Sequence, residues 1–189
     1  MSPSEPPVKA GTAEQRQRWL RPLLVGLIML AANVLAYYLI PPDVGDRLGA
    51  LGYLGIFLVT LIANATVVVP VPYYGVIWAL APKLNLLGVA AAGALGSSLG
   101  ESVAFFAGRS GRGAIEDTRF YRWVQDQMRH PVRAFVVLFL LSAPPNPAFD
   151  VAGLTAGAVG LPFWMFFAAV LLGRFVRTII IALIGVGLE

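Results

Sequence analysis

Residues 66–73 read TVVVPVPY and interrupt an apolar block that extends over residues 53–107. The block carries only two charged residues, Lys83 and Glu101, and it is much longer than the roughly 20 residues that one membrane-spanning helix needs. A continuous helix cannot pass through Pro70-Val71-Pro72, because each proline lacks the backbone donor and its ring clashes with the preceding turn. The sequence therefore predicts a helical hairpin that is broken at these prolines and is followed by a full span.

The prolines and the few polar residues of this block set the expected elements. One arm enters over residues 53–69, the other returns over residues 73–81, and a full span runs over residues 86–107, after Pro82, Lys83 and Asn85 at the surface. The returning arm has only about ten residues, which is too short to cross a hydrocarbon core of about 30 Å. We therefore expect a re-entrant hairpin; a pair of short true spans is the alternative.

A second apolar block, residues 134–187, repeats this organisation. It is broken at Pro144-Pro145-Asn146-Pro147. Asn146 is a favourable N-cap and Pro147 suits the first helical position, so a returning half-helix is expected over residues 147–158. A turn at Gly160-Leu161-Pro162 then precedes a last span over residues 163–184.

The two blocks together form an internal repeat. The first hairpin is expected to enter from outside and the second from the cytoplasm, so the repeats are predicted to be inverted, as in many transporters. The predicted fold class is an all-α integral membrane protein with two inverted repeats and an extra N-terminal transmembrane helix. Each repeat is a proline-broken re-entrant hairpin plus a transmembrane helix.

The composition argues against a soluble domain and most enzymes. Of 189 residues, 58% are hydrophobic and 13% are charged, whereas soluble domains have about 25% charged residues. The chain has no cysteine and one histidine, which excludes a disulfide framework and a multi-histidine metal site. It carries no common protease, hydrolase or nucleotide-binding motif. We expect no enzyme activity, cofactor, metal or nucleic-acid partner.

The N-terminal region is predicted to be a tail followed by a span. Residues 1–17 are polar and rich in proline, serine and glutamate, which predicts a disordered cytoplasmic tail. The apolar run over residues 20–40 is long enough to cross a membrane, and the cations before it place the amino terminus in the cytoplasm. A cleaved signal peptide is the alternative. Residues 18–189 are expected to form a single polytopic membrane domain.

Residues 108–133 are predicted to be a basic cytoplasmic connection between the two blocks. Six arginines stand here against three acidic residues, which indicates the cytoplasmic side. Phe120, Trp123, Val124 and Met128 recur at helical spacing, so we expect an interfacial amphipathic helix. A solvated charged loop that only determines the topology is the alternative.

Four ionisable side chains fall inside the predicted membrane region: Glu101, Asp150, Arg174 and Arg177. Such groups are costly in a bilayer, so each is a functional candidate. Arg174 and Arg177 share a helix face, and two guanidiniums suit a phosphate or a carboxylate. Glu101 and Asp150 would tune or release the anion by protonation. Two structural interpretations stay open: the acids neutralise the arginines in buried pairs, or Asp150 stabilises the positive end of its half-helix.

The hairpin tips are further candidates, because non-helical backbone at membrane depth needs a polar or protein interior. The tip residues are Pro70, Pro72, Pro145, Asn146 and Pro147.

Three weaker signals lie outside the tips. Arg109 is expected either to determine topology or to contact a headgroup, and Asn64 either to bond between helices or to belong to the site. Gly96 and Gly100, like Gly153 and Gly157, have the GxxxG spacing that predicts close helix packing, within the chain or across a homodimer.

The run GALGSSLGESVAFFAGRSGR, residues 93–112, resembles the glycine-rich, acid-containing span of the DedA family, also called the VTT or SNARE-associated Golgi protein family. Pro70-Val71-Pro72 is similar to the first hairpin tip of that family. Residues 145–174 are similar to its second hairpin and last span. The resemblance covers about residues 53–185.

This resemblance implies a protein that flips or scrambles phospholipid, or returns a polyprenyl-phosphate carrier across the inner membrane of a bacterium, in some members with proton coupling. Glu101 and Asp150 match acidic positions of the family pattern, and Arg109 and Arg174 match arginines. Membrane lipids are then the expected partners.

Two departures from the family pattern affect this expectation. Asn64 stands where many bacterial members carry an acid, and Leu141-Ser142 stands where many carry an arginine. These departures argue against proton coupling and against a phosphate carrier, and they favour the broader VTT group.

The leading hypothesis is a lipid flippase or scramblase in which Arg174, Arg177 and Arg109 contact an anionic headgroup in a polar groove between the hairpins. A proton- or cation-coupled transporter of a small solute is one alternative. A non-transporting scaffold for membrane homeostasis is the other.

Overall fold

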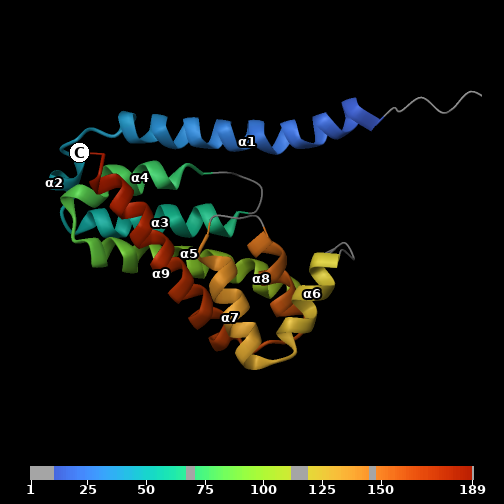
Figure 1. The fold of residues 1–189 in the computed structure, drawn as a ribbon. Coiled ribbons are helices and arrows are strands. Elements are labelled where there is room, and N and C mark those ends of the chain that lie inside the picture. The colour runs from blue at the N-terminus through green and yellow to red at the C-terminus, as the bar shows by residue number, and fades with distance from the viewer. Residues whose placement is uncertain (1–10, 67–70, 112–118, 145–147, 189) are drawn as a thin grey trace, which may run out of the picture.

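The computed structural model describes residues 11–66, 71–111, 119–144 and 148–188, without the side chains of residues 11–23, 120–121 and 148. These ranges are helical with short connections and contain no strand, as the predicted all-α class requires. The helices, shown in Figure 1, are α1 (Gly11–Leu39), α2 (Val44–Leu48), α3 (Leu51–Ala65), α4 (Tyr73–Leu80), the 3-10 turn η1 (Ala81–Lys83), α5 (Leu86–Arg109), α6 (Arg119–Met128), α7 (Pro131–Ser142), α8 (Ala148–Ala158) and α9 (Phe163–Val186).

Both apolar blocks break where their prolines predict. The first block divides between α3 and α4, with Pro72 directly before α4, and the second divides between α7 and α8. The remaining tip residues, Pro70, Pro145, Asn146 and Pro147, lie outside the described residues. Proline chemistry therefore locates both breaks correctly.

The N-terminal helix is longer than predicted. It begins at Gly11, so residues 11–17, which were expected to be disordered, belong to α1. Alanine, glutamate, glutamine and arginine in this stretch are good helix formers and extend the helix beyond its apolar part. The predicted tail before residue 11 lies outside the described residues.

The two long helices α5 and α9 form the centre of the fold. Each has 24 residues and is long and apolar enough to cross a membrane by length and composition. They pack against each other, and each also contacts one helix from the first apolar block and one from the second. α3 packs on α5 and α7 on α9, whereas the returning helices cross over, α4 to α9 and α8 to α5 (Figure 1).

Glycines permit this close packing. A side-chain carbon at Gly100 would lie 2.6 Å from the carbonyl oxygen of Leu61, and one at Gly96 would overlap the carbonyl of Phe57. These two residues therefore pack α5 against α3 within the chain. The second pair behaves differently: Gly157 meets the α5 backbone, whereas a carbon at Gly153 would make only ordinary contacts, the nearest at 3.7 Å.

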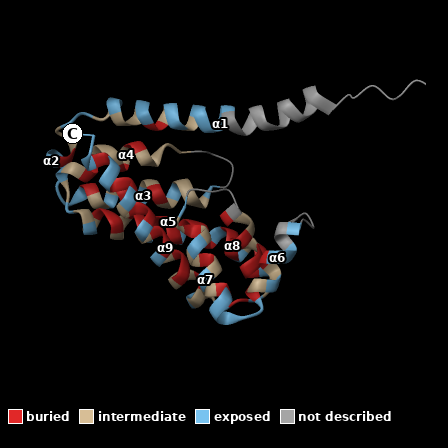
Figure 2. Ribbon diagram, in the orientation of Figure 1, coloured by how far each residue is buried: buried red, intermediate tan, exposed pale blue. Residues whose placement is uncertain are grey.

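The helix α6 is amphipathic, as predicted. Val124 and Met128 are buried in a core cluster with Phe105, Leu138 and Phe149, while Trp123 is half exposed. α6 packs on α8 and α7, so Arg119–Met128 is not the solvated loop of the alternative interpretation. The described apolar side chains of α1 are mostly exposed, as Figure 2 shows, and α1 packs on α4.

Candidate functional site

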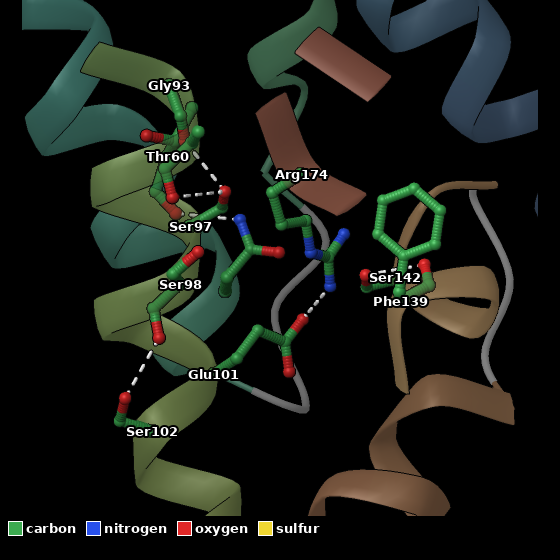
Figure 3. A network of polar contacts seen from close by, with 11 residues as sticks. Thr60, Gly93, Ser97, Ser98, Glu101, Ser102, Phe139, Ser142 and Arg174 are labelled. Carbon is green, nitrogen blue, oxygen red and sulfur yellow. Dashed lines mark hydrogen bonds and ion pairs between the residues drawn. The ribbon is translucent and has the colours of Figure 1, made fainter. Parts of the chain in front are cut away.

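An ion pair between the two central helices is the core of the candidate site. A guanidinium Nη of Arg174, on α9, donates to a carboxylate oxygen of Glu101, on α5. Both residues are buried, with 3% and 4% of their surface exposed. Figure 3 shows the two side chains pointing toward each other from facing helices. The structure thus brings two of the four candidate residues together in the interior, in a buried pair of the kind that the first structural interpretation describes.

Small polar residues line α5 around Glu101. Ser97 donates to the carbonyl of Gly93 at 2.7 Å, and Ser102 donates to the carbonyl of Ser98 at 2.9 Å (Figure 3). The Ser97 and Ser102 hydroxyls are thus satisfied by their own helix, whereas the buried Ser98 hydroxyl has no partner among the described residues.

The second hairpin contacts the same pair through the first turn of α8. The Cζ atom of Arg174 lies 4.9 Å from the centre of the Phe149 ring, which is a cation–π contact. Asp150 follows in the same turn, is half-buried, and interacts electrostatically with both Arg174 and Glu101. A carboxylate in the first turn also suits the positive end of α8, as the second structural interpretation expects.

Arg177 lies about one turn further along α9 and has different neighbours. Its Cζ atom is 5.2 Å from the Tyr74 ring and 6.0 Å from the Tyr73 ring, and it interacts with the Tyr73 hydroxyl. These are the first two residues of α4, so Arg177 faces the first hairpin. Its Nε atom is buried without a hydrogen-bond partner, and no carboxylate among the described residues pairs with it.

A contact between α1 and α4 was not anticipated from the sequence. The side-chain oxygen of Asn33 accepts a hydrogen bond from the backbone amide of Gly75 at 3.0 Å, and its amide donates to the Met29 carbonyl at 2.8 Å. Gly75 is in the first turn of α4, where backbone amides have no intrahelical acceptor. Two features of the sequence could have indicated this contact: Asn33 is a polar side chain in an apolar span, and Gly75 is a glycine early in a half-helix.

Two further candidates from the sequence differ in position: Arg109 lies apart from the ion pair, whereas the Asn64 backbone lies against Gly100, next to Glu101. Arg109 is exposed at the end of α5, eight residues from Glu101 and so about 12 Å along the helix axis. Asn64 donates to the Thr60 carbonyl of its own helix at 2.7 Å, and no bond from Asn64 to another helix is found among the described residues. Its amide is one helical turn beyond that carbonyl, and an asparagine there readily bonds back to its own helix.

Comparison with known families agrees with this architecture. The sequence profile of the VTT domain matches residues 59–187, which is well over half of the chain. The chain belongs to the VTT domain family. Both membrane-length helices, α5 and α9, lie inside the VTT match, and α1 precedes it. It is therefore a membrane protein of this family.

The most informative VTT relatives are vacuole membrane proteins. KMS1 of Arabidopsis thaliana is 45% identical over 65 residues, which are 34% of this chain and 15% of the relative. Vacuole membrane protein 1 of Homo sapiens is 28% identical over 119 residues, which are 52% of this chain and 29% of the relative. The aligned parts thus span less than a third of these relatives. No solved structure matches the chain.

Proposed function

We propose that this VTT protein moves lipid across a membrane, as a scramblase, a flippase or a carrier of a polyprenyl phosphate. The observation that supports the proposal is the buried ionic cluster where α5 and α9 cross. Ionisable groups inside a membrane are costly and are typical of substrate or ion pathways. The first turns of both returning helices reach this cluster, so both hairpins border the place where an anionic headgroup would pass.

The lengths of the returning helices support the re-entrant, inverted arrangement that we propose. α4 has 8 residues and α8 has 11, which correspond to about 12 Å and 16 Å. Neither length reaches across a hydrocarbon core of about 30 Å. The reciprocal packing of α4 on α9 and α8 on α5 is the pattern that a two-fold relation between the repeats would produce.

In this mechanism the headgroup phosphate binds to buried guanidinium, while the acyl chains stay in lipid. Glu101 and Asp150 set the charge of the path, and proton uptake by either would weaken its hold on Arg174. We further propose the inner membrane of a bacterium as the location, with a cytoplasmic amino terminus.

The test is lipid exchange between leaflets in proteoliposomes made with a fluorescent phospholipid. The core variant combines Glu101→Leu with Arg174→Met, which removes both charges together. Such a replacement of a buried pair is often neutral for stability. A matched control, Asp43→Asn with Arg47→Gln, also removes a paired carboxylate and guanidinium, but at an exposed i, i+4 site.

We expect the wild type and the control to exchange lipid, and the folded core variant to lose exchange. Exchange by the core variant at the wild-type rate would assign the pair a purely structural role, as the scaffold alternative requires. A folded wild type that moves no lipid, with or without a proton gradient, would contradict the proposal. Uptake of a small solute under that gradient would then favour the solute transporter.

A further inference from the structure

We propose that Arg177, with the first turn of α4, binds the phosphate group of the ligand, while Arg174 remains paired with Glu101. The sequence alone assigned this role to both arginines. The inference rests on the proposed function for the identity of the ligand, but the binding itself can be measured without transport.

The guanidinium charge of Arg177 is buried. Arg177 is 9% exposed and has no carboxylate partner in the part of the chain that the structure describes. Asp150 interacts with Arg174 and Glu101 instead. A buried cation without a counter-ion is unfavourable, so an anion at Arg177 is stabilised by a charge that is already in place.

The hydrogen-bond donors of the Arg177 guanidinium are not all satisfied. The buried Nε atoms of both Arg177 and Arg174 lack an acceptor among the described residues, but Arg174 also donates to the Glu101 carboxylate, whereas Arg177 has no carboxylate there. A guanidinium presents its donors in a planar fork that matches two oxygens of a phosphate. The vacant donor therefore indicates an acceptor that arrives with a ligand.

Arg177 faces the N-terminal end of α4. The guanidinium lies beside Tyr73 and Tyr74, which open α4, and a helix N-terminus carries partial positive charge that favours anions. Two amides of this turn already have acceptors: Tyr73 bonds to Val71, and Gly75 bonds to Asn33. The turn is thus held in place independently of the ligand, and its dipole adds to the charge of Arg177.

The two tyrosine rings complete the site. Both are only partly buried, whereas the guanidinium behind them is buried. A cation–π contact is weaker than a charge-assisted hydrogen bond to phosphate. We therefore expect an incoming phosphate to replace the rings as the contact of the Arg177 guanidinium. The Tyr73 hydroxyl is expected to donate a hydrogen bond to the bound anion.

The experiment is calorimetric titration of the full chain in an uncharged detergent. The probes are dihexanoyl phosphatidic acid, inorganic phosphate, and dihexanoylglycerol as the lipid without phosphate. The variants are Arg177→Gln and Arg177→Lys, and the matched control is the double variant Asp43→Asn with Arg47→Gln, which removes an exposed guanidinium and its carboxylate.

We expect phosphatidic acid to bind the wild type and dihexanoylglycerol to bind at least about tenfold more weakly. Arg177→Gln should weaken phosphatidic acid binding by about tenfold or more, because a charged hydrogen-bonding group is lost. Arg177→Lys should lose less, since it keeps the charge but not the fork. The control should bind within about twofold of the wild type, because the guanidinium that it removes is exposed and paired with a carboxylate four residues away.

Each further outcome decides between the sources of phosphate and between the two proposals. Arg177-dependent binding of inorganic phosphate as tight as that of phosphatidic acid would support the site and identify free phosphate as its ligand. Phosphatidic acid binding that does not change in Arg177→Gln would overturn the site, even if the wild type exchanges lipid in proteoliposomes. Arg177-dependent binding in a protein that moves no lipid would keep the site and reject the transport function.

Discussion

The two buried arginines of α9 lie three residues apart, yet each meets a different hairpin and a different chemistry. Arg174 pairs with Glu101 and contacts the first turn of α8, where Phe149 and Asp150 lie. Arg177 meets two tyrosines in the first turn of α4. The second hairpin thus borders a guanidinium whose charge is compensated. The first hairpin borders one whose charge is not.

This difference separates stability from binding. The guanidinium of Arg174 is paired with the Glu101 carboxylate. It therefore contributes to the packing of α5 on α9, and exchange of this carboxylate for another anion is not favoured. The guanidinium of Arg177 contacts two aromatic rings and the Tyr73 hydroxyl, and it can exchange these contacts for an anion. The comparison therefore predicts a large loss of stability at the Arg174 pair, a moderate loss at the anchor of α4, and a small change at Arg177.

The largest effect is expected for Glu101→Gln, which leaves Arg174 buried without its counter-charge. Breaking a buried pair from one side costs about 3–5 kcal/mol. For a chain of this length, that loss lowers the melting temperature by roughly 10 °C. Thermal unfolding in detergent, followed by tryptophan fluorescence, measures it.

The control for this prediction is the double variant Glu101→Leu with Arg174→Met. It should recover most of the lost stability, because no buried charge is left without a partner. If the double variant is as unstable as Glu101→Gln alone, the loss comes from packing at Glu101, and Arg174 is not the residue that depends on it.

An intermediate effect is expected for Asn33→Ala, which removes the acceptor for the Gly75 amide at the start of α4. Loss of a side-chain cap costs about 1 kcal/mol. Since α4 positions the two tyrosines, the variant should also weaken phosphatidic acid binding at Arg177. Unfolding and calorimetric titration of the same sample test both effects.

Asn64→Ala is the matched control, because the Asn64 amide donates to the Thr60 carbonyl of its own helix and, among the described residues, to no other helix. It should cost less stability than Asn33→Ala, because the half-buried Asn64 amide bonds back to its own helix and its loss leaves no amide of another helix without an acceptor, and it should leave binding unchanged. Equal effects of the two substitutions would show that the bond between α1 and α4 does not anchor the first hairpin.

Much of the fold could be predicted from the sequence, because the signals were local. Closely spaced prolines interrupt a helix, so the breaks before α4 and α8 follow from the proline clusters in each block. Long apolar runs predicted α5 and α9 to within a few residues. The sequence did not predict the start of α1, because the polar composition of residues 11–17 indicates disorder, although several of these residues favour a helix.

The site was only partly predictable, because its contacts join distant parts of the chain. Glu101 and Arg174 were both candidates from their positions in apolar spans. Their pairing with each other, rather than with Asp150 or Arg177, depends on how α5 packs on α9. The Asn33 contact joins helices that are separated by two others in the sequence, so no local pattern specifies it.

The smallest effect on stability is expected for Arg177→Met, and this prediction tests the comparison most directly. The substitution removes the cation–π contacts with Tyr73 and Tyr74, which are favourable by about 0.5–2 kcal/mol, but it also removes a buried charge that has no carboxylate. The two terms oppose each other, so stability should change by less than about 1 kcal/mol in the unfolding assay used for Glu101→Gln. A loss comparable to that of Glu101→Gln would mean that Arg177 is as firmly integrated into the fold as Arg174. The two hairpins would then border equivalent structural charges, and the assignment of one arginine to the ligand would lose its physical basis.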